Sequence, residues 1–477
     1  MTTKLLEEIE DWKLEAKLED TERYFYHTRV VSRILKGQKL YVVGRKGTGK
    51  TAISEHLDNL KEHDYFSQKL TFKNFPFNKL YALNDSGFTQ PNQYITLWKY
   101  VIYSTVCKLM ISNQSIDSDT RHRLEKIFND DIENALPNAV ERWTGLKFDL
   151  KILGTGGGIG ANREVVEKED SDWTRRVDIL ENFLKNNLGE CRYVVAFDEL
   201  DEDYKEIYEP QKYKQYTELL TSLFKAAQDI RARFSSHKLF PIIFIRDDIY
   251  EVLQDPDKTK WLDYKIDLEW NEASIKNMLA FRLSRSISKV GKIKEFHDVW
   301  NDLFERGGVK YGDRQRKVMS PFDYITRSSL LRPRDYVRYL QACAEASLEH
   351  GHFKIKPHNV AIADTAFSNY LRSELEDELH GLIPDIHKIL DIFTTLRKQT
   401  LRIEEFKDAY NEAIKQGLIE SGDFQFILQM LFHFSIIGNQ PKQKSFQVFR
   451  YKNKEARLNL KENIILHRGL FRSLQIL

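Results

Sequence analysis

Cysteine is scarce in this sequence, which has only 3 among 477 residues. Cys107, Cys191 and Cys343 lie far apart and form no C-x-x-C pair. Because scattered cysteines build neither a disulfide framework nor a thiolate zinc site, we expect a reduced protein that has neither. This cysteine usage is typical of the cytoplasm, which is the location we expect for the protein.

Long apolar runs are also missing. No stretch reaches the ~18 uninterrupted apolar residues of a membrane-spanning helix, so we expect no membrane span. The opening residues, MTTKLLEE, have no apolar core and carry acids, which predicts no secretory leader. Net charge is nearly absent too, with 73 Lys and Arg against 71 Asp and Glu. This balance alone implies no nucleic-acid partner.

Several enzyme signatures are absent as well. The sequence has no H-E-x-x-H, no G-x-S-x-G and no Cys/His spacing of a metal site, which argues against zinc peptidases and α/β-hydrolases. We also find no internal repeat and no low-complexity linker. Any chemistry must therefore come from another type of motif.

What the sequence does contain is a phosphate-loop pattern. Residues 44–51, GRKGTGKT, fit G-x-x-x-x-G-K-[ST] and follow an apolar run at 40–43 that predicts a buried strand. The residues from Ala52 on predict a helix, so the glycine-rich loop leads to a helix N-terminus that favours anions. We expect Lys50 to reach β- and γ-phosphate oxygens and Thr51 to ligate Mg²⁺. The predicted nucleotide-binding residues are Gly44, Arg45, Lys46, Gly47, Thr48, Gly49, Lys50, Thr51 and Ala52.

A second segment supplies the carboxylates that an NTPase needs. The apolar residues 193–197, YVVAF, predict a strand that ends in Asp198 and Glu199. At the carboxyl edge of a parallel sheet, Asp198 would hold Mg²⁺ and Glu199 would activate the attacking water. The alternative is a chance apolar–Asp–Glu pattern. The acids that follow, at 201–203, fit solvated loop residues better than a second metal site.

Two arginine segments extend this site. The strand predicted at 239–245 ends in Arg246, whose guanidinium can sense a γ-phosphate or can instead pair with Asp247 or Asp248. Further on, Pro333 predicts a helix start, which places Arg332 and Arg334 beside a helix N-terminus where anions bind. Either arginine could be a second sensor, and a simple Arg–Asp surface pair is the alternative.

The pattern of elements predicts an α/β fold, because strands alternate with helices as in a parallel sheet covered on both faces. We expect a helical lead-in at 1–37, with one helix over 4–19, and a P-loop NTPase core at 38–271. The core contains a helical insertion at about 90–190, in which the glycine-rich 154–160 is a loop. Strands are predicted at 39–43, 69–72, 80–82, 192–197, 239–246 and 264–270. A helical lid at 272–375 and a winged-helix-like domain at 376–477 follow.

The C-terminal domain is predicted from three amphipathic helices, at 386–396, 403–414 and 424–434, and a hairpin of 435–438 with 446–451. Nine Lys and Arg against two acids make residues 441–477 a basic surface. The hairpin could therefore touch duplex DNA. The third helix carries no Lys or Arg, so packing against protein is the favoured alternative.

With these motifs together, the sequence resembles AAA+/STAND-type P-loop ATPases. It is similar to a poorly characterised prokaryotic family related to the origin-recognition class. The resemblance covers about 25–350 and rests on four segments: GRKGTGKT, FDELD at 197–201, IRDDIY at 245–250 and RPRD at 332–335. It implies ATP with Mg²⁺ as the cofactors, Lys50 and Glu199 as catalytic residues, and Arg246 and Arg334 at the two sensor positions.

The sequence departs from this family pattern in two places. The spacing from Lys50 to Asp198 is long, which is why an insertion is expected. Residues 247–263 contain no Arg, so a trans-acting arginine finger is not evident, although Arg231 or Arg233 could replace it. Residues 78–81, NKLY, lack the Asp of a guanine-reading N-K-x-D motif, which favours ATP over GTP.

The resulting hypothesis is a Mg²⁺-dependent ATPase that acts as a switch on an unknown protein partner or on its own oligomerisation. One alternative is a nucleotide-gated DNA-binding protein that uses the C-terminal winged helix on duplex DNA. A phosphotransferase is disfavoured, since no acceptor-site signature accompanies Asp198 and Glu199.

Overall fold

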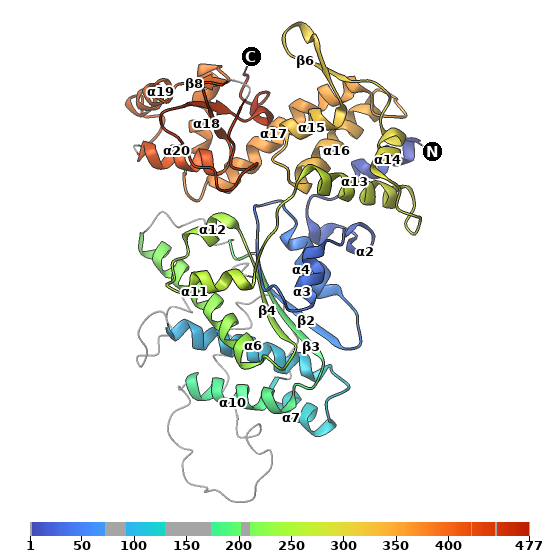
Figure 1. Ribbon diagram of the computed structural model, residues 1–477, viewed down its shortest axis with the longest axis vertical. Helices are drawn as coiled ribbons and strands as arrows, with labels where there is room; N and C mark the ends of the chain where they lie inside the picture. Colours follow the sequence, from blue (N-terminus) through green and yellow to red (C-terminus); the bar gives the residue numbers. More distant parts are fainter. Residues whose placement is uncertain are drawn as a thin grey trace, which may run out of the picture. The chain divides into compact units, whose positions relative to one another are not determined.

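The computed structural model of this protein describes residues 2–71, 92–128, 173–201, 210–420, 422–443 and 446–476. The chain divides into two units, coloured along the sequence in Figure 1. The sheet unit comprises 27–46 and 50–268. The helical unit comprises 1–26, 47–49 and 269–477. The predicted strand at 80–82 and the glycine-rich loop at 154–160 lie outside the described residues.

A five-stranded parallel sheet forms the core of the sheet unit, in the order β2-β3-β4-β1-β5. The apolar side chains of its central strands are buried on both faces, as in other parallel sheets. The strands are β1 Tyr41–Val43, β2 Tyr65–Thr71, β3 Arg192–Asp198, β4 Leu239–Ile245 and β5 Lys265–Asp267. This order inserts β4 between the strand that precedes the phosphate loop and the strand that ends in Asp198. The predicted α/β fold with a parallel sheet is confirmed.

Helices cover both faces of this sheet (Figure 1). The Phe197 ring of β3 meets Trp98 edge-on at 5.7 Å between centroids, whereas the next residue, Asp198, contacts Ser54. Successive strand residues point to opposite faces, so the helices that carry Trp98 and Ser54 lie on opposite sides. The helices are α3 Arg29–Leu35, α4 Lys50–Asn59, α6 Asn92–Ile111, α7 Ser118–Phe128, α10 Trp173–Asn187, α11 Pro210–Arg233 and α12 Asp247–Val252.

The helical unit is built from both ends of the chain. Its first part contains α1 Thr2–Glu10, α2 Thr21–Tyr24, α13 Glu272–Ile287, α14 Phe296–Leu303, α15 Pro321–Ser328, α16 Pro333–Glu349 and α17 Pro357–Leu379. Leu6 and Ile9 of α1 are fully buried in the core of this unit. The expected helix over 4–19 is wrong in length, because α1 ends at Glu10 and Trp12 turns inward to donate a hydrogen bond to Ser286 Oγ at 3.0 Å.

The sequence predicts a helical lid at 272–375, but the structure shows that this segment is not wholly helical. An antiparallel hairpin of β6 Val309–Tyr311 and β7 Lys317–Met319 interrupts the helices. Strands of three residues are too short to give a clear alternating pattern, so sequence periodicity missed them.

The C-terminal part contains the three expected helices, α18 Ile386–Leu396, α19 Ile403–Lys415 and α20 Phe424–His433. Three antiparallel strands, β8 Thr400–Leu401, β9 Ile437–Gln440 and β10 Asn463–Leu466, form a sheet in the order β8-β10-β9. The predicted hairpin partner at 446–451 is wrong, since β9 pairs with β10 and meets Val448 only through an isolated bridge at Asn439.

In the part of the chain that the structure describes, no helix combines the length and apolarity needed to cross a bilayer.

Candidate nucleotide site

The loop after β1 has the backbone that a phosphate cradle needs. Gly47 and Gly49 have φ values of +79° and +100°, a region that strongly favours glycine. Helix α4 begins at Lys50, directly after the loop, so its first N–H groups have no partner within the helix. Such a helix start attracts anions through both these N–H groups and the helix dipole.

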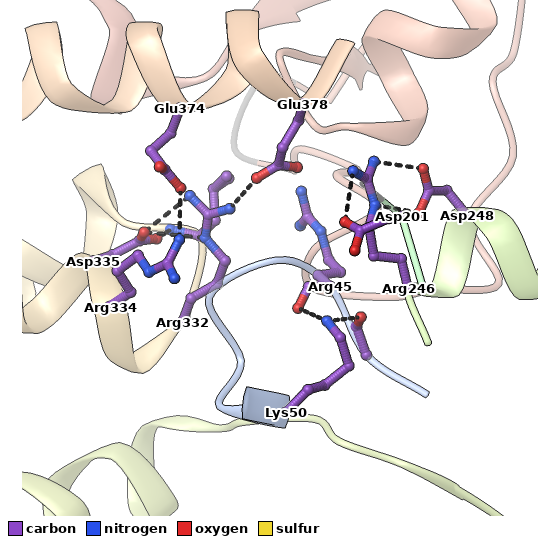
Figure 2. A network of polar contacts seen from close by, with 12 residues as sticks. Arg45, Lys50, Asp201, Arg246, Asp248, Arg332, Arg334, Asp335, Glu374 and Glu378 are labelled. Carbon is purple, nitrogen blue, oxygen red and sulfur yellow. Dashed lines mark hydrogen bonds and ion pairs between the residues drawn. The ribbon is translucent and has the colours of Figure 1, made fainter. Parts of the chain in front are cut away.

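Lys50 is the partly buried cation at the end of this loop. Its Nζ donates hydrogen bonds to the Gly44 and Arg45 carbonyl oxygens, at 2.8 and 3.0 Å (Figure 2). Burial lowers the pKa of Lys50, while the Asp201 carboxylate opposes that shift. Because the hydrogen-bond partners of this ammonium are neutral carbonyls, phosphate oxygens suit its position.

Asp198 ends β3 and is only 2% exposed. Ser54 Oγ of α4 donates a hydrogen bond to Asp198 Oδ2 at 2.5 Å. Burial raises the pKa of Asp198, and the Ser54 hydrogen bond acts in the opposite direction. The sequence reasoning missed Ser54, although it follows Thr51 by three residues and therefore shares its face of the helix.

The residue after Asp198, Glu199, has a left-handed backbone with φ of 56°. This conformation costs a non-glycine residue about 1–2 kcal/mol and recurs at functional sites. It marks the sharp turn by which the chain leaves β3.

The donor set fits a magnesium ion that is shared with phosphates. Among the described residues, no group of three or more His, Cys, Asp and Glu could hold a metal ion by itself. Mg²⁺ is usually held by one or two carboxylates together with phosphate oxygens and waters rather than by an all-protein cage. A hydroxyl at Thr51 and the carboxylate of Asp198 would be sufficient protein ligands.

Arg246 follows β4 at the same edge of the sheet as Asp198. Its Nε and Nη2 donate to the two carboxylate oxygens of Asp248 at 3.0 and 2.7 Å, and its Nη1 lies 3.4 Å from Asp201 Oδ2 (Figure 2). The structure therefore shows Arg246 paired with Asp248, which is one of the two alternatives that the sequence left open. Asp201 also contacts this guanidinium, although the sequence suggested that it is a solvated loop acid. The fork-like pair fixes the guanidinium in a single orientation.

Arg332 and Arg334, in the helical unit, have different surroundings. The Arg332 side chain is 1% exposed and forms ion pairs with Asp335 at 3.0 Å and Glu378 at 2.8 Å. Burial alone would lower its pKa, but Asp335 and Glu378 raise the pKa of Arg332 above its usual value. Arg332 is thus an internal structural cation and not a second sensor.

Arg334 keeps 25% of its side chain exposed and forms an ion pair with Glu374 of α17 at 3.2 Å (Figure 2). Loop residues 47–49 group with this unit. The Arg334 backbone N–H lies 3.5 Å from the Gly47 carbonyl oxygen, and Trp270 Nε1 donates to the Thr48 carbonyl oxygen at 2.8 Å. Both arginines lie near Gly47, and Arg334 is the more exposed of the two.

Comparison with protein-family models matches one part of the helical unit. Residues 273–376 match the model of the FunZ-associated C-terminal helical domain. The matched segment runs from α13 into α17 and includes Arg332, Arg334 and the β6–β7 hairpin. A search of curated proteins finds no match.

Solved structures show the expected likeness to the origin-recognition class. The ORC2 protein of Aeropyrum pernix, solved as ADPNP and ADP complexes, is 12% identical with a TM-score of 0.43, over 96% of this chain and 95% of that one. The ORC1 protein of the same organism, in complex with DNA, is 10% identical with a TM-score of 0.38, over 97% and 96%. Cdc6p of Pyrobaculum aerophilum is 11% identical with a TM-score of 0.34, over 95% and 96%. Likeness at this level carries no information on activity or partners.

Proposed function

We propose that this protein binds ATP with Mg²⁺ and hydrolyses it, and that the bound nucleotide switches its interaction with a protein partner or with other copies of itself. The observation that carries the proposal is the edge of the sheet. There, β1 leads into a loop that ends in a partly buried lysine, and β3, two strands away, ends in a buried aspartate. Phosphoryl transfer requires this pairing of a phosphate-binding cation with a metal-binding acid.

In this proposal the residues have separate roles. Lys50 holds β- and γ-phosphate oxygens in place of its two loop carbonyls. Thr51 and Asp198 hold the Mg²⁺, which neutralises charge on the phosphates, and Ser54 fixes the orientation of Asp198. Glu199 orients and deprotonates the attacking water.

The switch is assigned to two arginines. Arg246 would read the γ-phosphate while Asp248 and Asp201 hold it in position. Arg334 would exchange Glu374 for a phosphate oxygen when ATP binds, and would return to Glu374 after hydrolysis. A nucleotide that biases such a two-state contact shifts the population of the whole protein.

The test is a pair of substitutions with different expected outcomes. Lys50→Ala should weaken binding of a fluorescent ATP analogue at least ~100-fold, because both charge and hydrogen bonds to the phosphates are lost. Glu199→Gln should keep binding and reduce phosphate release at least ~100-fold, since the amide cannot accept the proton.

Lys61→Ala is the matched control, because Lys61 is an exposed lysine of the same unit and should change neither binding nor turnover. Full turnover by the Glu199→Gln protein would refute the role given to Glu199. Unchanged binding by the Lys50→Ala protein would refute the phosphate loop.

A second candidate function is a nucleotide-gated contact with duplex DNA through the C-terminal domain. The observation in its favour is the order α18-β8-α19-α20-β9-β10, which is that of a winged helix, with a long, basic connection at 441–462 in the wing position. Neutralising Lys442, Lys444 and Arg450 should then reduce both DNA affinity and its salt dependence. Unchanged values would exclude this wing.

A further inference from the structure

The β6–β7 hairpin concentrates positive charge at one place in the helical unit. Residues 305–319 carry five cations, Arg306, Lys310, Arg314, Arg316 and Lys317, against two acids, Glu305 and Asp313. All five cations are exposed. Among the side chains that the structure describes, none forms an ion pair with them. Figure 1 shows β6 beside the helices α15 to α17.

The ladder places these cations on both faces of the ribbon. Lys310 pairs in register with Val318, and Lys317 pairs with Tyr311. Neighbouring residues of a strand point to opposite faces, so Lys310 and Lys317 project from opposite sides. Val318 is 59% exposed on the Lys310 side. The opposite face packs on the helical unit, because Val309 is buried and Tyr311 and Met319 lie against its core.

The turn of the hairpin carries the remaining charge. Gly312, Arg314 and Gln315 have φ values of 75°, 51° and 52°. Two consecutive non-glycine residues in the left-handed region form a tight turn, which holds Arg314 and Arg316 at the tip. Arg327 of α15 lies over the Tyr311 ring at 4.5 Å and so holds the end of β6 next to this turn.

We propose that the tip and the exposed face of this hairpin contact duplex DNA at the major groove. The major groove of B-DNA admits a two-stranded ribbon, and phosphates line both of its walls. Arg314 and Arg316 at the tip, with Lys310 on the exposed face, suit these phosphates, whereas the major groove of duplex RNA is too narrow for side chains to read. Phosphates carry the same charge in every DNA sequence, so this contact supplies affinity and salt dependence rather than base recognition. The inference does not depend on ATP hydrolysis or on the C-terminal wing.

The test compares two triple variants of the full-length protein. Lys310, Arg316 and Lys317→Gln removes hairpin charge, and Lys13, Lys289 and Lys292→Gln removes the same charge from three other exposed positions of this unit. Binding to a fluorescein-labelled 30-base-pair DNA duplex is followed by anisotropy between 50 and 200 mM NaCl. Binding of the fluorescent ATP analogue and the circular dichroism spectrum report folding of every variant.

We expect the hairpin variant to lose affinity about tenfold or more at 100 mM NaCl, and its plot of log K against log[salt] to become shallower by about 2 to 3, because each lost phosphate contact removes ~0.9 from the slope. The control variant should stay within about threefold of the unsubstituted protein. Equal affinity and slope for the hairpin variant and the control would overturn the proposal.

Three other results would also overturn it. One is the absence of measurable duplex binding by the unsubstituted protein at 50 mM NaCl. Another is tighter binding to an RNA duplex of the same length. The third is binding to vesicles of 30% phosphatidylserine and 70% phosphatidylcholine, lost in the hairpin variant, while DNA binding is unchanged.

Discussion

At the scale of single residues, two arginines at the start of α16 show how burial separates a structural role from a sensing role. Arg332 is buried and forms ion pairs with two buried acids, whereas Arg334 is partly exposed and forms an ion pair with one partly exposed acid. Removing an acid from a buried pair leaves an uncompensated charge, and this cost falls as the pair becomes more exposed. Arg334 is therefore the arginine that can exchange its partner at the lower cost.

Glu374→Gln should increase ATP affinity by up to about fivefold. The Arg334–Glu374 pair is worth up to ~1 kcal/mol, and a phosphate would no longer compete with the carboxylate for this arginine. Glu376→Gln is a matched control, because Glu376 lies on the same helix and pairs with Arg372 instead. Titration with the fluorescent ATP analogue measures both variants. Equal affinities for them would contradict the exchange assigned to Arg334.

His56 gives a residue-scale prediction for pH. Burial and the neighbouring His27 lower the pKa of His56 to about 4 from its usual 6.5, so the folded protein holds a neutral ring. Between pH 6.5 and pH 4, His56 is protonated in the unfolded chain but stays neutral in the folded protein. Stability is therefore complete above pH 6.5 and falls as the pH drops towards 4, by about 1–2 kcal/mol after allowance for partial exposure.

Thermal unfolding at pH 7 and pH 5 measures this effect. His56→Gln should reduce the pH dependence, and His63→Gln, at an exposed position of the same unit, should leave it as it was. The same pH dependence in the His56→Gln protein would assign the effect to other groups.

At the scale of elements, the C-terminal segment after β10 is tied to the helices of the FunZ-associated region. Arg468 forms an ion pair with the buried Asp364 of α17 at 2.9 Å. Tyr324, Ser328 and Tyr339 donate hydrogen bonds to the same carboxylate. The next residue after Arg468, Gly469, approaches the backbone so closely that an added Cβ would lie 2.1 Å from the Ser328 carbonyl oxygen.

Gly469→Ala should therefore destabilise the protein by about 2–3 kcal/mol, because a backbone carbonyl must move to make room for the methyl group. Gly351→Ala is the informative comparison. An added Cβ there meets nothing within 4 Å, so only its φ of 65° opposes alanine. Urea unfolding of the two variants measures the difference, and equal losses would show that the close approach is not a constraint.

The sequence predicts elements well where the apolar pattern is long. The three C-terminal helices begin where expected, and the central strands β3 and β4 end within a residue of their predicted ends. The sequence does not predict strands that are very short, or strand pairs whose members lie far apart in the chain. The β6–β7 strands are too short for a pattern, and the partner of β9 is chosen by a contact that no local signal encodes.

The sequence also predicts one part of the candidate site, the phosphate loop, but not the other, the partners of the arginines. The phosphate loop is recognisable because its chemistry requires glycines and a lysine in consecutive positions. The partners of Arg246, Arg332 and Arg334 depend on acids from other elements, namely Asp201, Glu378 and Glu374. Such pairs are set by tertiary structure, so sequence reasoning could only leave sensing and pairing as alternatives.

At the scale of the whole molecule, each of the two units has its own hydrophobic core. We therefore expect calorimetry to resolve two unfolding transitions. ATP with Mg²⁺ should raise the free energy of unfolding of the sheet unit, which carries Lys50, by about 2.7 kcal/mol at a ligand concentration of 100 Kd. The unfolding temperature of that unit should rise accordingly. Lys50→Ala should abolish that shift. A single transition, unchanged by nucleotide, would contradict the expectation.

The construction of the helical unit from both chain ends also has a consequence for biosynthesis. The Gln341 side chain of α16 donates a hydrogen bond to the Trp12 carbonyl oxygen at 2.6 Å, across a sequence separation of 329 residues. At typical translation rates, about 15 to 65 s pass between the synthesis of these two residues. Throughout that interval, the apolar face of α1 on the nascent chain lacks its native partner. Helix α1 therefore leaves the ribosome long before α16 and docks late, and its apolar face is a segment that a chaperone would need to shield during this interval.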